Sequence, residues 1–202
     1  MDLKDDNKIP EILQELNKLD KMHIYVGVFG ADNSFMVMIA SVNEFGARIK
    51  PKVARYLTIP LKKKYRGKSP RDFDLFFYES KEGNKFLVRE KGKDQLEFAY
   101  MLTQEVNIPE RSFLRSTFDQ NEKKWFSFAK KQLEKIMAGE ISAKEACDRL
   151  GARMQSDVQK TIRNVRTPPN APSTVASKGS SNPLIDSGRM RQSIIWKVED
   201  DG

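Results

Sequence analysis

The side chains that most often carry chemistry are scarce in this 202-residue chain, which has one histidine and one cysteine. His23 begins an apolar run, and neither a catalytic triad nor a metal cluster can be built around it without distant carboxylates. Cys147 falls on an apolar helical stripe, where a small core residue is the better interpretation. Gly27 and Gly30 lack the rest of a phosphate-loop pattern. Glu44, at the end of an apolar helix, could be functional or could pair with an arginine. We therefore expect no enzymatic activity, no metal and no cofactor.

A basic stretch lies between Phe45 and Asp72, where ten lysines and arginines occur and no acidic residue does. Removing these ten charges from the formal net charge of +8 leaves −2 for the remaining chain, so the basicity is local. Its lysine cluster could bind a phosphate backbone with salt-dependent affinity, or it could be a solvated polar loop, which we favour. The residues that could contact DNA are Lys62, Lys63, Lys64, Arg66 and Lys68.

Apolar spacing predicts the elements of the N-terminal half. We expect a helix over about 9–19 and then a strand near 24–29 that is covered on both faces. A second helix would start at its N-cap Ser34 and stop at Gly46, with Phe35, Met38, Ile39 and Val42 on the face that packs on a sheet. After this helix we expect a strand over about 54–61 and a polar mobile loop over 62–71. A hairpin turning near Gly83 and a third strand from Leu96 should come next.

Helical periodicity begins beyond Pro109. Helices over about 119–139 and 142–165 should form an antiparallel pair, the second starting with a capping box of Ser142 and Glu145. The segment 167–183 contains four prolines and one charged residue, so we expect a long, extended, exposed loop. A strand-like run from about Arg191 could return to the sheet.

These elements predict a single α+β domain over 1–202. A predominantly antiparallel β-sheet would pack against the helix pair, with short N-terminal helices and the long extended loop. No uncharged run approaches the roughly 20 residues that cross a bilayer, so we expect a soluble protein without a secretion signal or membrane contact.

Three segments together resemble a known family. They are IASVNEFGARI at 39–49, NIPERSFLRSTFD at 107–119, and PPNAPSTVASKGSSNPLIDSGRMRQSI at 168–194. They resemble the tail-completion or neck proteins of long-tailed bacteriophages, also described as tail-component or virion-morphogenesis proteins. The resemblance covers roughly 39–196, and its third segment is the most specific. The stretch 62–105 is longer than a minimal fold of this kind needs and reads as a β-hairpin embellishment.

The resemblance implies a structural virion protein of the head–tail junction, made in the host bacterial cytoplasm and needed to join tail to head. It also implies a homo-oligomeric ring around the DNA channel, for which we guess six-fold symmetry, with other phage neck and tail proteins as partners and non-specific contact with DNA. Ring subunits meet through two different surfaces. The candidates for assembly contacts or local architecture are Asn43, Glu44, Phe45, Gly46, Ile108, Pro109, Arg111, Phe113, Arg115, Pro169, Asn170, Pro172, Ser173, Thr174, Lys178, Pro183, Leu184, Asp186, Gly188 and Arg189. A DNA-binding accessory protein that uses the basic patch at 48–71 is the alternative.

Overall fold

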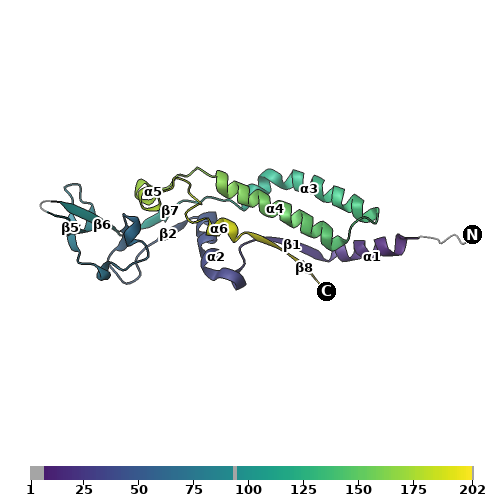
Figure 1. The fold of residues 1–202 in the computed structure, drawn as a ribbon, viewed down its shortest axis with the longest axis horizontal. Coiled ribbons are helices and arrows are strands. Elements are labelled where there is room, and N and C mark those ends of the chain that lie inside the picture. The colour runs from purple at the N-terminus through teal and green to yellow at the C-terminus, as the bar shows by residue number, and fades with distance from the viewer. Residues whose placement is uncertain (1–6, 93–94, 202) are drawn as a thin grey trace, which may run out of the picture. The chain divides into compact units, whose positions relative to one another are not determined.

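The computed structural model describes residues 7–92 and 95–201, except the side chains of Ala31 and Asp32, and has an α+β fold with antiparallel strand pairs (Figure 1). The chain divides into two compact units instead of the single domain that we expected. The helical unit comprises 7–40, 112–164 and 187–201, and the sheet unit comprises 41–111 and 165–186 without the two undescribed positions. Length could not reveal this division, because each unit joins segments that are distant in sequence.

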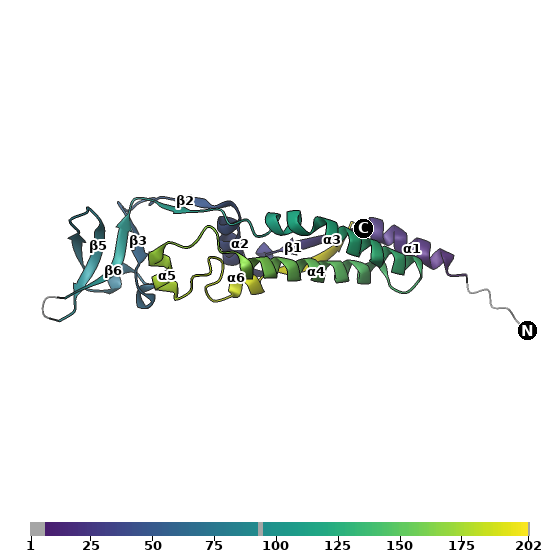
Figure 2. The same cartoon turned by 90° about the horizontal axis from the view of Figure 1, so that it is seen from above.

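The helical unit is built on three helices, α1 (Ile9–Asp20), α3 (Arg115–Met137) and α4 (Ala143–Asn164). α3 and α4 lie side by side in both views (Figure 1, Figure 2), which confirms the predicted pair. Two polar contacts fix their register: the Thr117 and Thr161 hydroxyls lie 2.6 Å apart, and the Trp125 indole donates to Asp157 at 2.8 Å.

A two-stranded ribbon completes the helical unit. β1 (Met22–Gly27) pairs antiparallel with β8 (Ile195–Asp200), which follows the short helix α6 (Arg189–Gln192), and α4 packs against both strands. The expectation that β1 is covered on both faces was wrong, because α4 covers one face and Tyr25 on the other is exposed. Gly151 allows the close approach of α4, since a Cβ there would lie 2.4 Å from the Trp196 ring.

The helix α2 (Gly30–Phe45) begins differently from the prediction. Asn33 has an extended, non-helical backbone, and its side-chain oxygen accepts a hydrogen bond from the Met36 amide at 3.0 Å. Asn33, and not Ser34, therefore caps the regular part of α2. Its end is as predicted, because Gly46 adopts a positive φ of 71°.

The buried face of α2 was also predicted wrongly. Met36, Ala40 and Glu44 are the buried positions, whereas Phe35 and Met38 are 54% and 53% exposed and Phe45 is 65% exposed. Both faces have helical spacing, and the sequence favoured the more apolar one. The structure leaves that apolar face open.

The described part of the sheet unit contains two separate antiparallel sheets. β3 (Leu57–Pro60), β4 (Phe76–Glu79), β5 (Lys85–Glu90) and β6 (Leu96–Thr103) form one sheet in the order β3-β6-β5-β4, and β2 (Ala47–Ile49) pairs with β7 (Val106–Ile108). The predicted hairpin is confirmed as β4–β5, and β6 adds beside β5 (Figure 2). Within the helical unit, α4 packs on the β1–β8 ribbon. We had expected the helix pair to pack against one main sheet, but the strands that the structure describes are divided among three separate sheets.

Two segments predicted as open loops are folded. The segment 62–71 holds the 3₁₀ turns η1 (Lys63–Tyr65) and η2 (Pro70–Asp72), and Tyr65 is buried with Tyr100 and Ala99. The segment 167–183 contains the short helix α5 (Pro172–Lys178), on which Ser177 is buried, and its remaining residues are irregular, as expected of a loop. Both segments are polar, which suggested loops. The residues that hold them in place are distant along the chain, so the local sequence did not indicate them.

Candidate functional site

Arg111 belongs to the sheet unit and is only 7% exposed as a residue. Its Nε donates to the carbonyl of Pro168 at 2.7 Å, and its Nη2 donates to the carbonyl of Pro169 at 3.0 Å and to Oδ1 of Asn170 at 3.4 Å. A planar guanidinium suits such neighbouring acceptors, because its donors point in fixed directions. Arg111 thus fastens a segment 57 residues away in sequence.

The segments 39–49 and 107–119 meet at the same place. The Arg111 amide donates to the carbonyl of Asn43 at 2.7 Å, and the pairing of β2 with β7 continues this contact. Gly46 lies so close that a Cβ would be 3.0 Å from the backbone of Ile108 and Glu110. Its positive φ and this close approach both favour glycine.

The segment 165–186 has further anchors within the sheet unit. The ammonium group of Lys178 donates to the carbonyls of Asn182 and Pro183 at 2.8 and 3.3 Å, which closes the chain after α5. Arg66 binds Asp186 through two hydrogen bonds of 3.2 and 2.5 Å. This bidentate pair joins the end of the segment to the basic stretch.

Burial and charge shape this junction together. Burial lowers the pKa of Arg111, and it also lowers the pKa of Lys178. The hydrogen bonds from Arg66 lower the pKa of Asp186, and Lys178 contributes to the same effect. We call the set of Arg66, Arg111, Asn170, Lys178 and Asp186 the arginine junction. It holds backbone carbonyls in place and contains no nucleophile with an adjacent base.

The expected contact residues divide by burial. Glu44, Arg111, Phe113, Pro183 and Leu184 are buried, so they build the fold; the exposed ones are Phe45, Arg115, Pro169, Pro172, Thr174, Asp186 and Arg189. The remaining members are half-buried: Asn43, Gly46, Ile108, Pro109, Asn170, Ser173, Lys178 and Gly188. Phe113, Arg115, Gly188 and Arg189 belong to the helical unit, so the sheet unit brings together the other members of the set.

The basic stretch is organised around a carboxylate that sequence reasoning missed. The Glu97 side chain is 2% exposed, and its two oxygens accept from Lys62 at 3.1 Å, from Lys64 at 2.5 Å and from Arg89 at 2.8 Å. These bonds, that of Lys64 foremost, lower the pKa of Glu97 to about 2 against the opposing effect of burial. Alternation along β6 could have indicated an inward carboxylate, but its partners lie on other strands and turns.

Two of the expected DNA contacts have other roles. Arg66 is held by Asp186 in the arginine junction, and the Lys68 ammonium group lies 5.7 Å from the centre of the Phe73 ring, within range of a cation–π contact. The stretch is therefore not a simple solvated loop. Besides these two cations and the two lysines that bind Glu97, Arg48 and Lys50 pair with Glu105, and Arg55 lies over the Tyr56 ring.

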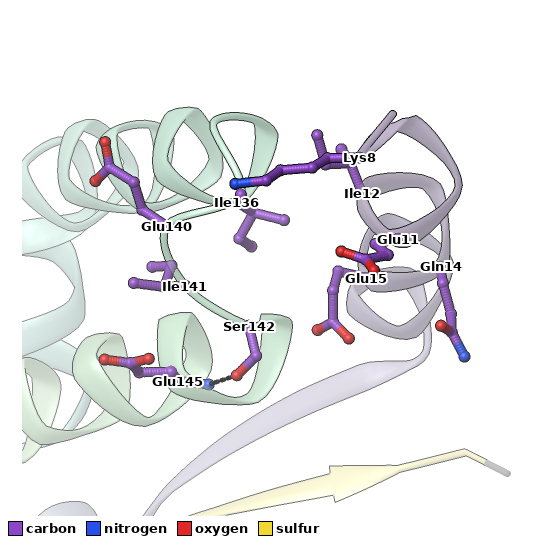
Figure 3. A pocket seen from close by; sticks show the side chains of 11 residues that line it. Lys8, Glu11, Ile12, Gln14, Glu15, Ile136, Glu140, Ile141, Ser142 and Glu145 are labelled. Atoms are coloured by element: carbon purple, nitrogen blue, oxygen red, sulfur yellow. Dashed lines mark hydrogen bonds between the residues drawn. The ribbon is translucent and has the colours of Figure 1, made fainter. Parts of the chain in front are cut away.

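A hollow of about 560 Å³ lies in the helical unit between α1 and the turn that joins α3 to α4. Figure 3 shows Glu11 and Glu15 of α1 pointing toward this turn. Glu15 accepts from the Ala143 amide at 2.7 Å, and Ser142 accepts from the Glu145 amide at 3.1 Å (Figure 3). The second bond confirms Ser142 as a capping residue, and both contacts satisfy amides at the start of α4. These two contacts give Glu15 and Ser142 structural roles.

His23 and Cys147 belong to the helical unit. His23 Nε2 is 2.7 Å from an Asp201 oxygen on the exposed edge of the ribbon, and Cys147 is buried on α4, as predicted. Burial raises the pKa of the Cys147 thiol, which disfavours the reactive thiolate. Across 7–92 and 95–201, no group of three or more His, Cys, Asp or Glu side chains is placed to hold a metal ion. Within the same ranges, no helix is long and apolar enough to span a bilayer.

Comparisons with protein-family models, curated proteins and solved structures gave no significant match to this chain.

Proposed function

We propose that this chain is a structural virion protein of the head–tail junction of a long-tailed bacteriophage, a tail-completion or neck subunit that assembles as a homo-oligomeric ring. The observation that carries the proposal is the convergence of the three segments on which the resemblance rests. Asn43, Arg111 and the carbonyls of Pro168 and Pro169 are joined directly in one hydrogen-bonded framework. This contact between segments far apart in sequence supports the proposal that they act together in one assembly unit.

The open face of α2 supports an assembly role. Phe35 and Met38 lie one helical turn apart on the part of α2 that belongs to the helical unit, and each is more than half exposed. Contiguous exposed apolar side chains are typical of interaction surfaces. A neighbouring subunit or another neck protein would cover this face, because a ring subunit needs two unlike contact surfaces.

The DNA-binding alternative receives less support as a complete function. Arg66 and Lys68 are held within the fold, and Lys62 and Lys64 bind Glu97. A few cations can still face the DNA in a ring channel without making DNA binding the purpose of the protein.

The proposal is tested in phage particles that lack the protein. A stop codon in the gene should give filled heads beside unattached tails in negative-stain microscopy, and the wild-type gene supplied from a plasmid should restore joined particles. Normal joined particles without the protein would refute the proposal.

The contact surface is tested by complementation with surface variants. Phe35→Ser with Met38→Ser should fail to restore joined particles while the purified variant keeps the wild-type thermal midpoint. Phe126→Ser, which removes a 76% exposed aromatic side chain from α3, is the control and should complement. If the double variant complements fully, the α2 face is not the contact surface.

A further inference from the structure

The Glu97 cluster combines a buried carboxylate with cations that reach solvent. The side chains of Lys62 and Lys64 are each 48% exposed and that of Arg89 is 42% exposed, although the carboxylate that holds them is almost fully covered. Glu97 therefore orients the three cations from below and leaves their outer sides accessible.

The cluster has more positive charge and more donors than Glu97 can use. Three cations and one carboxylate leave a local charge of +2. Each ammonium group has three N–H donors and the guanidinium has five, while Glu97 offers only two oxygens. The outward donors can bind a second anion at little ordering cost, because Glu97 already fixes the side chains.

Tyr65 adds an unexplained polar group at this place. Its hydroxyl is buried and makes no hydrogen bond, and it is the one such side-chain group among the residues that the structure describes. The Lys64 ammonium group lies 5.0 Å from the centre of the Tyr65 ring, which puts this side chain beside the cluster. A buried hydroxyl without a partner is costly, and a bound acceptor would remove that cost.

We infer that Lys62, Lys64 and Arg89, arranged by Glu97 and completed by the Tyr65 hydroxyl, form a binding site for a phosphate group. A phosphate has several strong acceptor oxygens and the negative charge that the +2 cluster lacks. Two members of this site, Arg89 and Tyr65, lie outside the set of DNA contacts that the sequence suggested. The inference stands on this cluster and does not depend on the neck proposal.

Phosphate groups come from nucleic-acid backbones or from free phosphate, and two probes distinguish these sources. The first is a 30-base-pair duplex DNA titrated into the full chain, with fluorescence anisotropy measured over a series of salt concentrations. Lys62→Ala with Lys64→Ala should weaken binding about tenfold and reduce the slope of log K against log salt by about 1. Lys81→Ala with Lys91→Ala is the control, since it removes two exposed lysines of the same unit.

The second probe is inorganic phosphate, followed by shifts of the amide signals of residues 62–68 and 89 in NMR spectra. Tyr65→Phe is the decisive variant for both probes, because it removes only the unpartnered hydroxyl and should leave the fold intact. It should weaken binding of the ligand about tenfold, the effect of one hydrogen bond to a charged group.

The outcomes separate clearly. DNA binding that is weakened both in Lys62→Ala with Lys64→Ala and in Tyr65→Phe would support a backbone-phosphate site. Shifts caused by inorganic phosphate alone, weakened in Tyr65→Phe, would support a free-phosphate site. The inference would be overturned if the wild-type protein bound neither probe. It would also be overturned if wild type and Tyr65→Phe bound a probe equally well.

Discussion

Replacement of Arg111 by methionine should release the segment 165–186 while leaving the strands of the four-stranded sheet in place. Methionine keeps the length and the apolar contacts of the arginine stem but has no donor. The carbonyls of Pro168 and Pro169 and Oδ1 of Asn170 would then lose their donor. Because these acceptors hold the start of the segment, the release should be local.

The size of the effect follows from these bonds. A hydrogen bond from a charged donor contributes about 1.5–3 kcal/mol, and a buried acceptor left unpaired costs about 1–3 kcal/mol. The substitution also removes the cost of burying the guanidinium, whose pKa is lowered by that burial. We expect a net loss of about 2–4 kcal/mol, which increases the local opening equilibrium about 30- to 700-fold.

Hydrogen exchange of the backbone amides of 170–186 measures this opening. Arg111→Lys should lie between wild type and Arg111→Met, because a single ammonium group cannot match the fork of donors. Arg71→Met removes an exposed arginine of the same unit and should leave exchange unchanged. Wild-type exchange rates over 170–186 in Arg111→Met would refute the assigned role.

Three further predictions concern packing, pH and capping. Gly151→Ala should lower the free energy of unfolding by about 0–2 kcal/mol in urea denaturation. The clash with the Trp196 ring costs about 1–3 kcal/mol and outweighs or cancels the helix-propensity gain of about 1 kcal/mol. A clear gain in stability would contradict this contact. Since the folded pKa of Glu97 is depressed to about 2, its contribution is present above the ordinary value of 4.5 and is lost as pH falls from about 5 to 2. That contribution is at most about 3 kcal/mol, and about half of this after solvent screening at the exposed cations. Glu97→Gln should therefore flatten the dependence of stability on pH in acid denaturation. An unchanged dependence would count against the cluster. Asn33→Ala should cost about 1 kcal/mol by thermal denaturation while Ser34→Ala costs little, and the reverse order would restore Ser34 as the cap.

The sequence by itself determined the elements whose signals are local. Apolar spacing located α1, α3 and α4, and the turn residues near Gly83 located the β4–β5 hairpin. Ser142 and Gly46 were correctly predicted to mark a helix start and a helix end: Ser142 accepts from the Glu145 amide, and Gly46 has a positive φ. Such signals are readable because the interacting groups lie within a few residues of one another.

The same local signals failed where a helix had two usable faces. The spacing of α2 allowed burial of either Phe35 and Met38 or Met36 and Ala40, and hydrophobicity favoured the first pair wrongly. The side that is buried depends on which neighbour is present, and periodicity along one helix does not contain that information.

Only the tertiary structure decided the two clusters on which the proposals rest. Arg111 meets Pro168 across 57 residues, and Lys62 meets Glu97 across 35. Their charges were visible in the sequence, but nothing near them along the chain specified their partners. Such pairs form when packing of the whole unit repays the loss of chain entropy, so their geometry belongs to the fold and not to any one segment.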